Sequence, residues 1–356
     1  MEHKENKHQM TAPRAKGVAV KGRFAPSPTG RMHLGNVYAA LMSWLSAKSQ
    51  GGEWLLRIED LDPQRSRAEY AHTLMDDLLW LGLEWDEGPG RERGAGPYWQ
   101  SQRGHLYEQA LWRLQGMGLV YPCTCTRADI MATQAPHESD GRVVYRGTCR
   151  PMLALPWERI MAPHGPTTLS DGGSAAAVCD GHAPSGIAVG TAALRLMVPP
   201  EPLATVVCPD RHYGVVSVNL ATHCGDFVVR RRDQAWAYQL AVVVDDALMG
   251  VTEVVRGRDL LLSAPQQMYV ARLLGYEPPA FAHIPLLVNE AGQRLSKRDR
   301  SLDMGVLRSR YTPEALLGRL AHLAGLTPDE APVRLADLIP LFAWNRVPKD
   351  DVVCPL

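Results

Sequence analysis

A histidine near the start of the chain has surroundings suited to binding phosphate. His33 belongs to the run His33-Leu34-Gly35-Asn36, which opens an expected helix after a loop broken by proline and glycine. The free N–H groups and positive dipole of a helix start attract phosphate, and Gly35 lets a nucleotide approach the backbone. His33 could then donate to charge that develops on an α-phosphate. On its own, the run also fits a polar turn with a capping histidine.

A lysine far along the chain could contact the same ligand. Lys297 lies in the basic run Arg294-Leu295-Ser296-Lys297-Arg298. A lysine on a mobile loop can reach a triphosphate in the transition state, where binding energy accelerates the reaction. A solvated basic turn is the alternative for this run alone. The candidates for binding ATP are therefore His33, Gly35 and Lys297, with His33 and Lys297 as the catalytic pair.

Three cysteines could hold a metal ion. Cys123 and Cys125 are separated by one residue. Tyr145 comes about twenty residues after Cys125, and Cys149 follows it in the run Tyr145-x-x-x-Cys149. Thiolates suit zinc, and a site with four ligands would stabilise a segment too small to have its own core. By themselves, three cysteines fit a metal site and free thiols equally well. The odd total of seven cysteines does not indicate a secreted disulfide framework.

The elements around these groups alternate between strands and helices. Apolar runs predict strands at 18–24 and 54–58, and apolar residues at helical spacing predict helices at 34–50 and around 74–81. This order indicates a parallel sheet with crossover helices, which binds ligands at the carboxyl ends of its strands. Further elements are expected at 192–198, 226–231, 236–248, 252–256, 265–274, 283–297 and 316–323.

The regular pattern fails between residues 121 and 190, where Pro, Gly, Ala and Ser dominate. We therefore expect an α/β protein with a Rossmann-type parallel sheet, an insertion that carries the zinc site, and a short helical C-terminal part. The expected divisions are a flexible N-terminus at 1–20, the two halves of the catalytic domain at 21–120 and 191–275, the insertion at 121–190, and the lysine loop with the C-terminal part at 276–356. Residues 152–185 are expected to be the least ordered part of the insertion.

Charge and hydropathy exclude some classes of protein. The 356-residue chain has 38 basic and 38 acidic residues, so any contact with RNA must come from a local patch. No stretch approaches the roughly 20 apolar residues that span a bilayer. We expect a soluble, cytoplasmic, monomeric protein with no membrane partner.

The two phosphate-binding candidates, in this order, resemble the paired HIGH and KMSKS signatures of class I aminoacyl-tRNA synthetases. The lead-in Phe24-Ala25-Pro26-Ser27-Pro28-Thr29-Gly30 narrows the resemblance to the glutamyl/glutaminyl branch. Residues 56–62, 100–103, 241–246 and 254–260 extend it from about Lys21 to Arg298. The sequence departs from the signatures at Asn36, which replaces the second histidine, and at Arg294 and Arg298, which replace the outer positions of the lysine loop.

This resemblance implies a site for glutamate. It places the amino acid against Arg23, Ser27, Glu59, Tyr238 and Arg256. Two carboxylates need cationic forks, and an ammonium needs an acid, so Glu59 is assigned to the ammonium and the arginines with Tyr238 to the carboxylates. Without the resemblance, Glu59 fits a solvated strand end and Tyr238 fits a core residue.

The resemblance also extends to the cysteines and the length of the chain. Cys123, Cys125, Tyr145 and Cys149 look like the structural zinc site of the glutamyl-Q branch, in which a tyrosine occupies this position. Only residues 298–356 follow Lys297, whereas glutamyl-tRNA synthetases carry a helical domain there that reads the anticodon. Glutamyl-Q enzymes lack that domain.

The glutamyl-Q enzymes activate L-glutamate with ATP and Mg²⁺ and attach it to queuosine in the anticodon loop of tRNA(Asp). This is the activity that the resemblance implies. A compact glutamyl-tRNA synthetase, which charges the 3′-terminal adenosine, a catalytically silent tRNA-binding paralogue and another nucleotidyl transferase of the superfamily are the alternatives.

Overall fold

The computed structural model describes residues 19–132, 144–153, 156–160, 192–295 and 302–354. Near its start, strand β1 (Lys21–Phe24) pairs in parallel with β2 (Glu53–Leu56), and helix α1 (Leu34–Ser49) connects them. The apolar face of α1, which includes Leu34, Leu41 and Leu45, is fully buried. The expected strand, helix and strand are therefore confirmed, with ends that differ by a few residues.

A four-stranded sheet continues the fold. Its order is β6 (Gly214–Asn219), β5 (Thr205–Asp210), β9 (Ala280–Ile284) and β8 (Glu253–Gly257). Strands β8, β9 and β5 are parallel, whereas β6 is antiparallel to β5. The N–H of Thr252 donates to the carbonyl of Lys21 at 2.9 Å, which joins β8 to β1. The expected parallel core is present, and the β5–β6 hairpin makes the whole sheet mixed.

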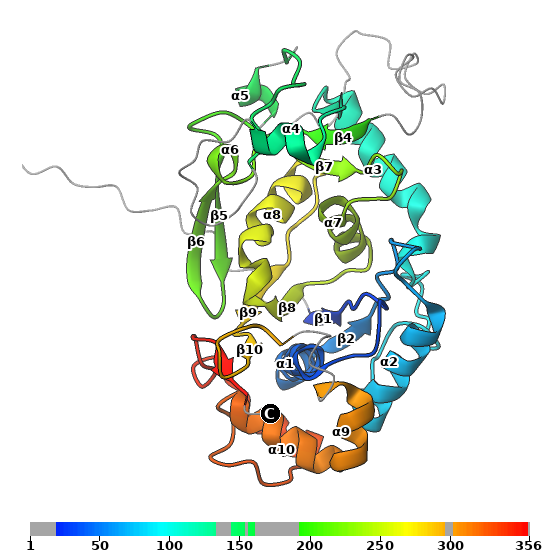
Figure 1. Cartoon of the computed structure of the whole chain (residues 1–356), viewed down its shortest axis with the longest axis vertical. Helices are drawn as coiled ribbons and strands as arrows, with labels where there is room; N and C mark the ends of the chain where they lie inside the picture. Colours follow the sequence, from blue (N-terminus) through cyan, green and yellow to red (C-terminus); the bar gives the residue numbers. More distant parts are fainter. Residues whose placement is uncertain (1–18, 133–143, 154–155, 161–191, 296–301, 355–356) are drawn as a thin grey trace, which may run out of the picture.

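Helices cover both sides of these strands (Figure 1). Helices α7 (Tyr238–Leu248) and α8 (Ala264–Leu273) pack together on one side, and α1 lies on the other. Helix α2 (Ala68–Trp80) follows β2 as expected. A short 3₁₀ helix (Gln100–Gln102) then leads into α3 (Gly104–Gly116), which packs against α7 and which the sequence analysis missed.

A separate antiparallel sheet flanks the cysteines. It consists of β3 (Val120–Cys123), β4 (Ala193–Leu196) and β7 (Phe227–Arg230), with the short helices α4 (Arg127–Ala132), α5 (Trp157–Ile160) and α6 (Leu220–His223) nearby. Most of the stretch expected to be least ordered, 152–185, lies outside the described residues. The domain boundaries proposed above stay predictions.

The C-terminal part contains helices and one short strand. Helices α9 (Met304–Arg310), α10 (Pro313–Leu323) and α11 (Leu335–Leu338) precede β11 (Val352–Val353), which pairs in parallel with β10 (Leu287–Val288). Over 283–297 we expect a strand with a turn at 289–292, and the turn is present, with the N–H of Gly292 donating to the carbonyl of Asn289 at 2.9 Å. The strand before the turn is divided into β9 and β10, because Pro285 lies between them and lacks the N–H of a continuous strand. Among the described residues, no helix has the length and apolarity needed to cross a membrane.

Candidate active site and cysteine cluster

His33 is the N-cap of α1, and its side chain helps to hold the start of that helix. Its Nδ1 accepts a hydrogen bond from the N–H of Gly35 at 3.2 Å, while Asn36 Oδ1 accepts one from the N–H of His33 at 3.2 Å. These reciprocal bonds form a capping box. The capping interpretation of His33 is therefore confirmed, and Asn36, which departs from the family signature, has a defined structural role.

The segment after the lysine signature returns to this helix start. Asp303, the N-cap of α9, forms an antiparallel bridge with His33, and the N–H of Met304 donates to the carbonyl of Met32 at 2.9 Å. Lys297 itself falls within 296–301, outside the described residues. The structure thus brings the exit of the lysine loop beside His33 and leaves the role of Lys297 a prediction.

A cleft of about 510 Å³ lies at the carboxyl ends of β1 and β2 and at the start of α7. Parallel sheets bind ligands at this end of their strands. Three of the five residues that the resemblance places against glutamate line the cleft together: Ser27, Glu59 and Tyr238. Arg256 reaches this lining through a hydrogen bond to Tyr238, and Arg23 is connected to Glu59 through Asp246 and Arg57.

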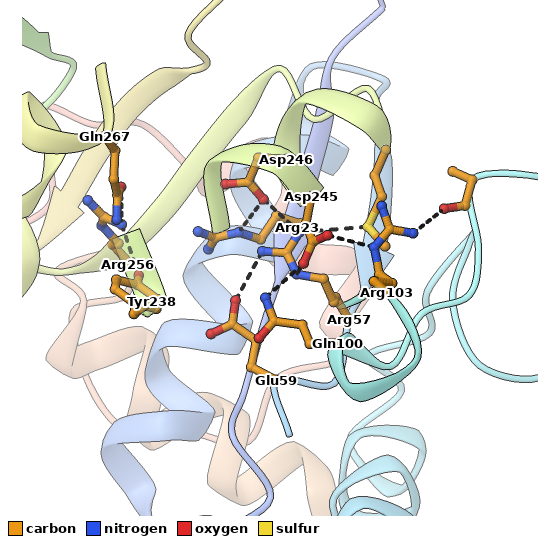
Figure 2. A network of polar contacts seen from close by, with 12 residues as sticks. Arg23, Arg57, Glu59, Gln100, Arg103, Tyr238, Asp245, Asp246, Arg256 and Gln267 are labelled. Atoms are coloured by element: carbon orange, nitrogen blue, oxygen red, sulfur yellow. Dashed lines mark hydrogen bonds and ion pairs between the residues drawn. The ribbon is translucent and has the colours of Figure 1, made fainter. Parts of the chain in front are cut away.

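Arg57 connects the acidic groups next to the cleft (Figure 2). Its fully buried guanidinium donates from Nη1 to Asp246 Oδ1 at 2.7 Å and from Nη2 to Glu59 Oε1 at 3.0 Å. Arg23 adds a longer contact, from Nε to Asp246 Oδ1 at 3.4 Å. Burial raises the pKa of Glu59 although both arginines oppose this shift. Burial disfavours ionisation of Asp246 as well, but the same two charges hold the pKa of Asp246 below its ordinary value.

Asp245 joins α7 to the preceding helices. It accepts hydrogen bonds from Arg103 Nε at 2.6 Å, Gln100 Nε2 at 2.8 Å and the Tyr107 hydroxyl at 2.8 Å. All four side chains are buried. With Arg57 and Arg23, the cluster contains three guanidinium groups and three carboxylates, namely Arg23, Arg57, Arg103, Glu59, Asp245 and Asp246. Their charges balance when every group is ionised.

Arg256, on β8, is a buried cation whose hydrogen-bond partners are uncharged. Its side chain donates from Nη1 to Tyr238 Oη at 3.2 Å and to Gln267 Oε1 at 2.8 Å, and from Nη2 to the Leu260 carbonyl at 3.3 Å. Nε donates to His283 Nε2 at 3.1 Å. Burial lowers the pKa of His283, with help from the charge of Arg256, so the ring is neutral at pH 7. No carboxylate among the described residues forms an ion pair with Arg256, so the position favours an anionic ligand.

The cysteines lie close enough together to hold a metal ion. The Sγ atoms of Cys123, Cys125 and Cys149 are all within 4.8 Å of one another, and those of Cys125 and Cys149 are 3.5 Å apart. Tetrahedral zinc with Zn–S bonds of about 2.3 Å needs sulfur atoms about 3.8 Å apart. The Tyr145 hydroxyl lies 3.5 Å from Cys123 Sγ and accepts the N–H of Cys149 at 2.7 Å. The four residues therefore fit a single metal ion.

The surroundings of Cys149 favour its thiolate form. Although burial works in the other direction, hydrogen bonds from the Thr124 backbone and the Tyr145 hydroxyl lower the pKa of Cys149 to about 7. Gly225 holds Tyr145 in place: the two form a parallel bridge, and Gly225 has a φ of 61°. A Cβ at Gly225 would overlap the carbonyl oxygen of Tyr145. A glycine is therefore required for this close approach.

Several groups of the site were absent from the sequence-based predictions. Arg57 and the pair Asp245–Asp246 lie in the family-like segments, but no role was assigned to them. Their signal was charge inside apolar runs, since Arg57 follows Trp54–Leu56 and the two aspartates follow Leu240–Val244. His283 was left unassigned, because its importance depends on a neighbour from another strand.

Comparison with known proteins agrees with this arrangement. The family model described as tRNA synthetases class I (E and Q), catalytic domain, matches residues 19–160 and 183–352. A crystal structure of a glutamate-tRNA synthetase from Elizabethkingia anophelis superposes with a TM-score of 0.73 at 27% identity, covering 95% of this chain and 68% of that one.

Two curated relatives are similar over nearly their whole length. A glutamyl-Q tRNA(Asp) synthetase from Symbiobacterium thermophilum is 45% identical over 94% of this chain and 95% of the relative. Another protein of that name, from Nitratidesulfovibrio vulgaris, is 42% identical over 94% of this chain and 96% of the relative. The chain therefore belongs to the class I tRNA synthetase family of the glutamyl and glutaminyl type, and within it to the glutamyl-Q tRNA(Asp) synthetases.

Proposed function

We propose that this protein activates L-glutamate with ATP and transfers it to queuosine at the wobble position of tRNA(Asp). The names of the relatives that match along nearly their whole length support the choice of RNA. The observation that carries the choice of amino acid is Arg256, a 5% exposed cation beside the cleft with no carboxylate partner among the described residues. A carboxylate of the substrate would supply the missing counter-charge.

The remaining groups fit the other charges of glutamate. Arg23 uses Nε for Asp246, so its Nη edge is the fork offered to the second carboxylate. Ser27, on the lining, would add a hydroxyl donor. Burial disfavours the ionised form of Glu59, and the ammonium of the substrate would favour that form by adding a positive charge. Arg256 and Arg23 would thus face the two carboxylates of glutamate, and Glu59 would face its ammonium.

Activation joins the amino acid to the nucleotide in one displacement. An oxygen of the glutamate α-carboxylate attacks the α-phosphorus of ATP, and pyrophosphate leaves. The N–H groups at the start of α1, Gly35, His33 and Lys297 are assigned to the phosphates, with Mg²⁺ entering as the ATP complex. In the second step a hydroxyl of the cyclopentenediol attacks the acyl carbonyl of the adenylate, AMP leaves, and an ester forms. No nucleophilic side chain is needed, because positioning and charge stabilisation supply the rate.

The cysteine cluster is assigned a structural zinc ion held by Cys123, Cys125, Tyr145 and Cys149. The thiolate character of Cys149 and the spacing of the sulfur atoms support this choice. The cluster is connected to a segment far along the chain, because the backbone of Tyr145 forms a bridge with that of Gly225. Zinc would therefore hold the segment that follows β3 against the segment that precedes β7.

The test measures activation and acceptor separately. Glutamate-dependent exchange between ATP and pyrophosphate, without RNA, should be present in the purified protein. Labelled glutamate should then react with queuosine-containing tRNA(Asp) that lacks its 3′-terminal adenosine, and with an anticodon stem-loop that carries queuosine. The same stem-loop with guanine is the matched control and should stay unlabelled. Label only on RNA with an intact 3′ end would instead indicate a compact glutamyl-tRNA synthetase, and absence of exchange would indicate a silent paralogue.

A further inference from the structure

The hydrogen bonds of Arg256 continue to a buried histidine–aspartate pair. Arg256 on β8 and His283 on β9 are register partners in the parallel sheet. The His283 ring is fully buried; its Nε2 accepts from Arg256 Nε at 3.1 Å, and its Nδ1 lies 2.6 Å from Asp210 Oδ2. Asp210 ends β5, the next strand of the same sheet. Three neighbouring strands thus contribute one group each to a continuous chain of hydrogen bonds.

The two partners of the ring decide which nitrogen carries its hydrogen. Asp210 also accepts backbone N–H groups from His212 at 3.0 Å, Tyr213 at 2.8 Å and His283 at 3.1 Å. Such a carboxylate is ionised and only accepts, so Nδ1 must donate. A guanidinium only donates, so Nε2 must keep its lone pair for Arg256. His283 is therefore the neutral Nδ1–H tautomer.

A neutral acceptor at this point has a consequence for the charge of Arg256. A carboxylate in place of the imidazole would satisfy the Nε–H but would also neutralise the guanidinium. The imidazole satisfies this N–H and keeps the ionised Asp210 one side chain away, so no carboxylate in the described part of the chain contacts the guanidinium. The two N–H groups of Nη1 donate to Tyr238 Oη and Gln267 Oε1, and one N–H of Nη2 donates to the Leu260 carbonyl. The second N–H of Nη2 has no hydrogen-bond partner among the described residues.

We propose that His283, held by Asp210, is a positioning residue that orients Arg256 and preserves its charge for the substrate carboxylate. The inference rests on the proposed function, which assigns Arg256 to glutamate. Asp210 and His283 do not touch the substrate; they act through the guanidinium. The pair therefore contributes to selecting glutamate over glutamine, whose neutral amide cannot compensate a buried cation.

Two substitutions of the same residue separate the two hydrogen bonds of the ring. The amide oxygen of His283→Gln reaches the region of Nε2 and can accept from Arg256. The shorter side chain of His283→Asn ends near Nδ1, so it can donate to Asp210 but offers Arg256 no acceptor. Both variants are neutral and polar. We expect His283→Asn to raise the KM for glutamate about tenfold or more with little change in the KM for ATP, and His283→Gln to stay within about threefold of wild type.

Equal effects of the two variants on the glutamate KM, or none, would overturn the inference. A measurement on the unsubstituted protein does not depend on how the variants fold: nitrogen-15 spectra of histidine-labelled protein should show His283 with hydrogen on Nδ1. Hydrogen on Nε2 would also overturn it. Absence of glutamate-dependent exchange in the wild-type protein would instead refute the proposed function, while the nitrogen-15 spectra would still decide the state of His283.

Discussion

Replacing Arg57 by methionine should strongly destabilise the fold. The side chain of Arg57 is fully buried, and its guanidinium donates hydrogen bonds of 2.7 Å to Asp246 and 3.0 Å to Glu59. Asp245 Oδ2 lies 3.7 Å from Arg57 Nε. Without it, three carboxylates face two guanidinium groups. Methionine fills a similar volume, so the loss is mainly electrostatic. Removing one partner of a buried ion pair costs about 3–5 kcal/mol, which is the loss expected in the free energy of unfolding at neutral pH.

The destabilisation should depend on pH in a defined direction. Loss of Arg57 removes a charge that lowers the pKa values of Glu59 and Asp246, so both values rise in the folded variant. A carboxyl group with a raised pKa in the folded state binds more protons there than in the unfolded state. Its stabilising effect is present at low pH and is lost as pH rises. The difference from wild type should therefore be smaller at pH 5.5 than at pH 8.

Urea unfolding followed by tryptophan fluorescence at both pH values measures these differences. Arg334→Met is the matched control, because Arg334 is 78% exposed and pairs only with Asp337 among the described residues. This control should unfold like wild type. Adding Asp246→Asn to Arg57→Met should recover part of the loss by restoring the balance of charge. The reasoning is refuted if Arg57→Met behaves like Arg334→Met, or if its destabilisation grows as pH falls.

Three further outcomes are expected. Lys297→Ala should lower glutamate-dependent pyrophosphate exchange about 10²-fold with an unchanged circular dichroism spectrum, and near-normal exchange would remove Lys297 from the site. Elemental analysis should find one zinc per chain. Gly225→Ala should reduce the zinc content and lower the melting temperature, because a Cβ at this position overlaps the Tyr145 carbonyl. An unchanged zinc content and melting temperature would contradict the structural role. The folded state lowers the pKa of His283, so stability should fall as pH drops below about 6.5, where only the unfolded chain takes up the proton. Urea unfolding between pH 5.5 and 7.5 should show a flatter profile in His283→Gln, and identical profiles would count against a buried neutral ring.

Local sequence patterns were sufficient for elements with a clear apolar period. The helix that begins at Leu34 follows from apolar residues at helical spacing and ends before Gly51, as expected. Helix α3 was missed although its buried residues Tyr107, Ala110, Leu111 and Leu114 have the same spacing. The β5–β6 hairpin was missed because alternating burial along Thr205–Asp210 depends on a partner strand, and its outward side still carries valine.

The site divides in the same way. The resemblance to the family predicted Ser27, Glu59 and Tyr238, which the structure places along one cleft, and the spacing of Cys123, Cys125 and Cys149 indicated their grouping. The motifs that carry the resemblance are recognisable because each is a short run of consecutive residues.

Only the tertiary structure decided which charges compensate one another. Arg57 meets Asp246 across 189 residues, and His283 meets Asp210 across 73. Electrostatic energy depends on distance and burial in space, neither of which can be read from neighbours along the chain. The sequence by itself therefore determined the family signature and the types of group available. The packing of β5, β8 and β9 with α7 and α8 determined that Arg256 has no carboxylate partner among the described residues, because it places neutral acceptors around a buried guanidinium.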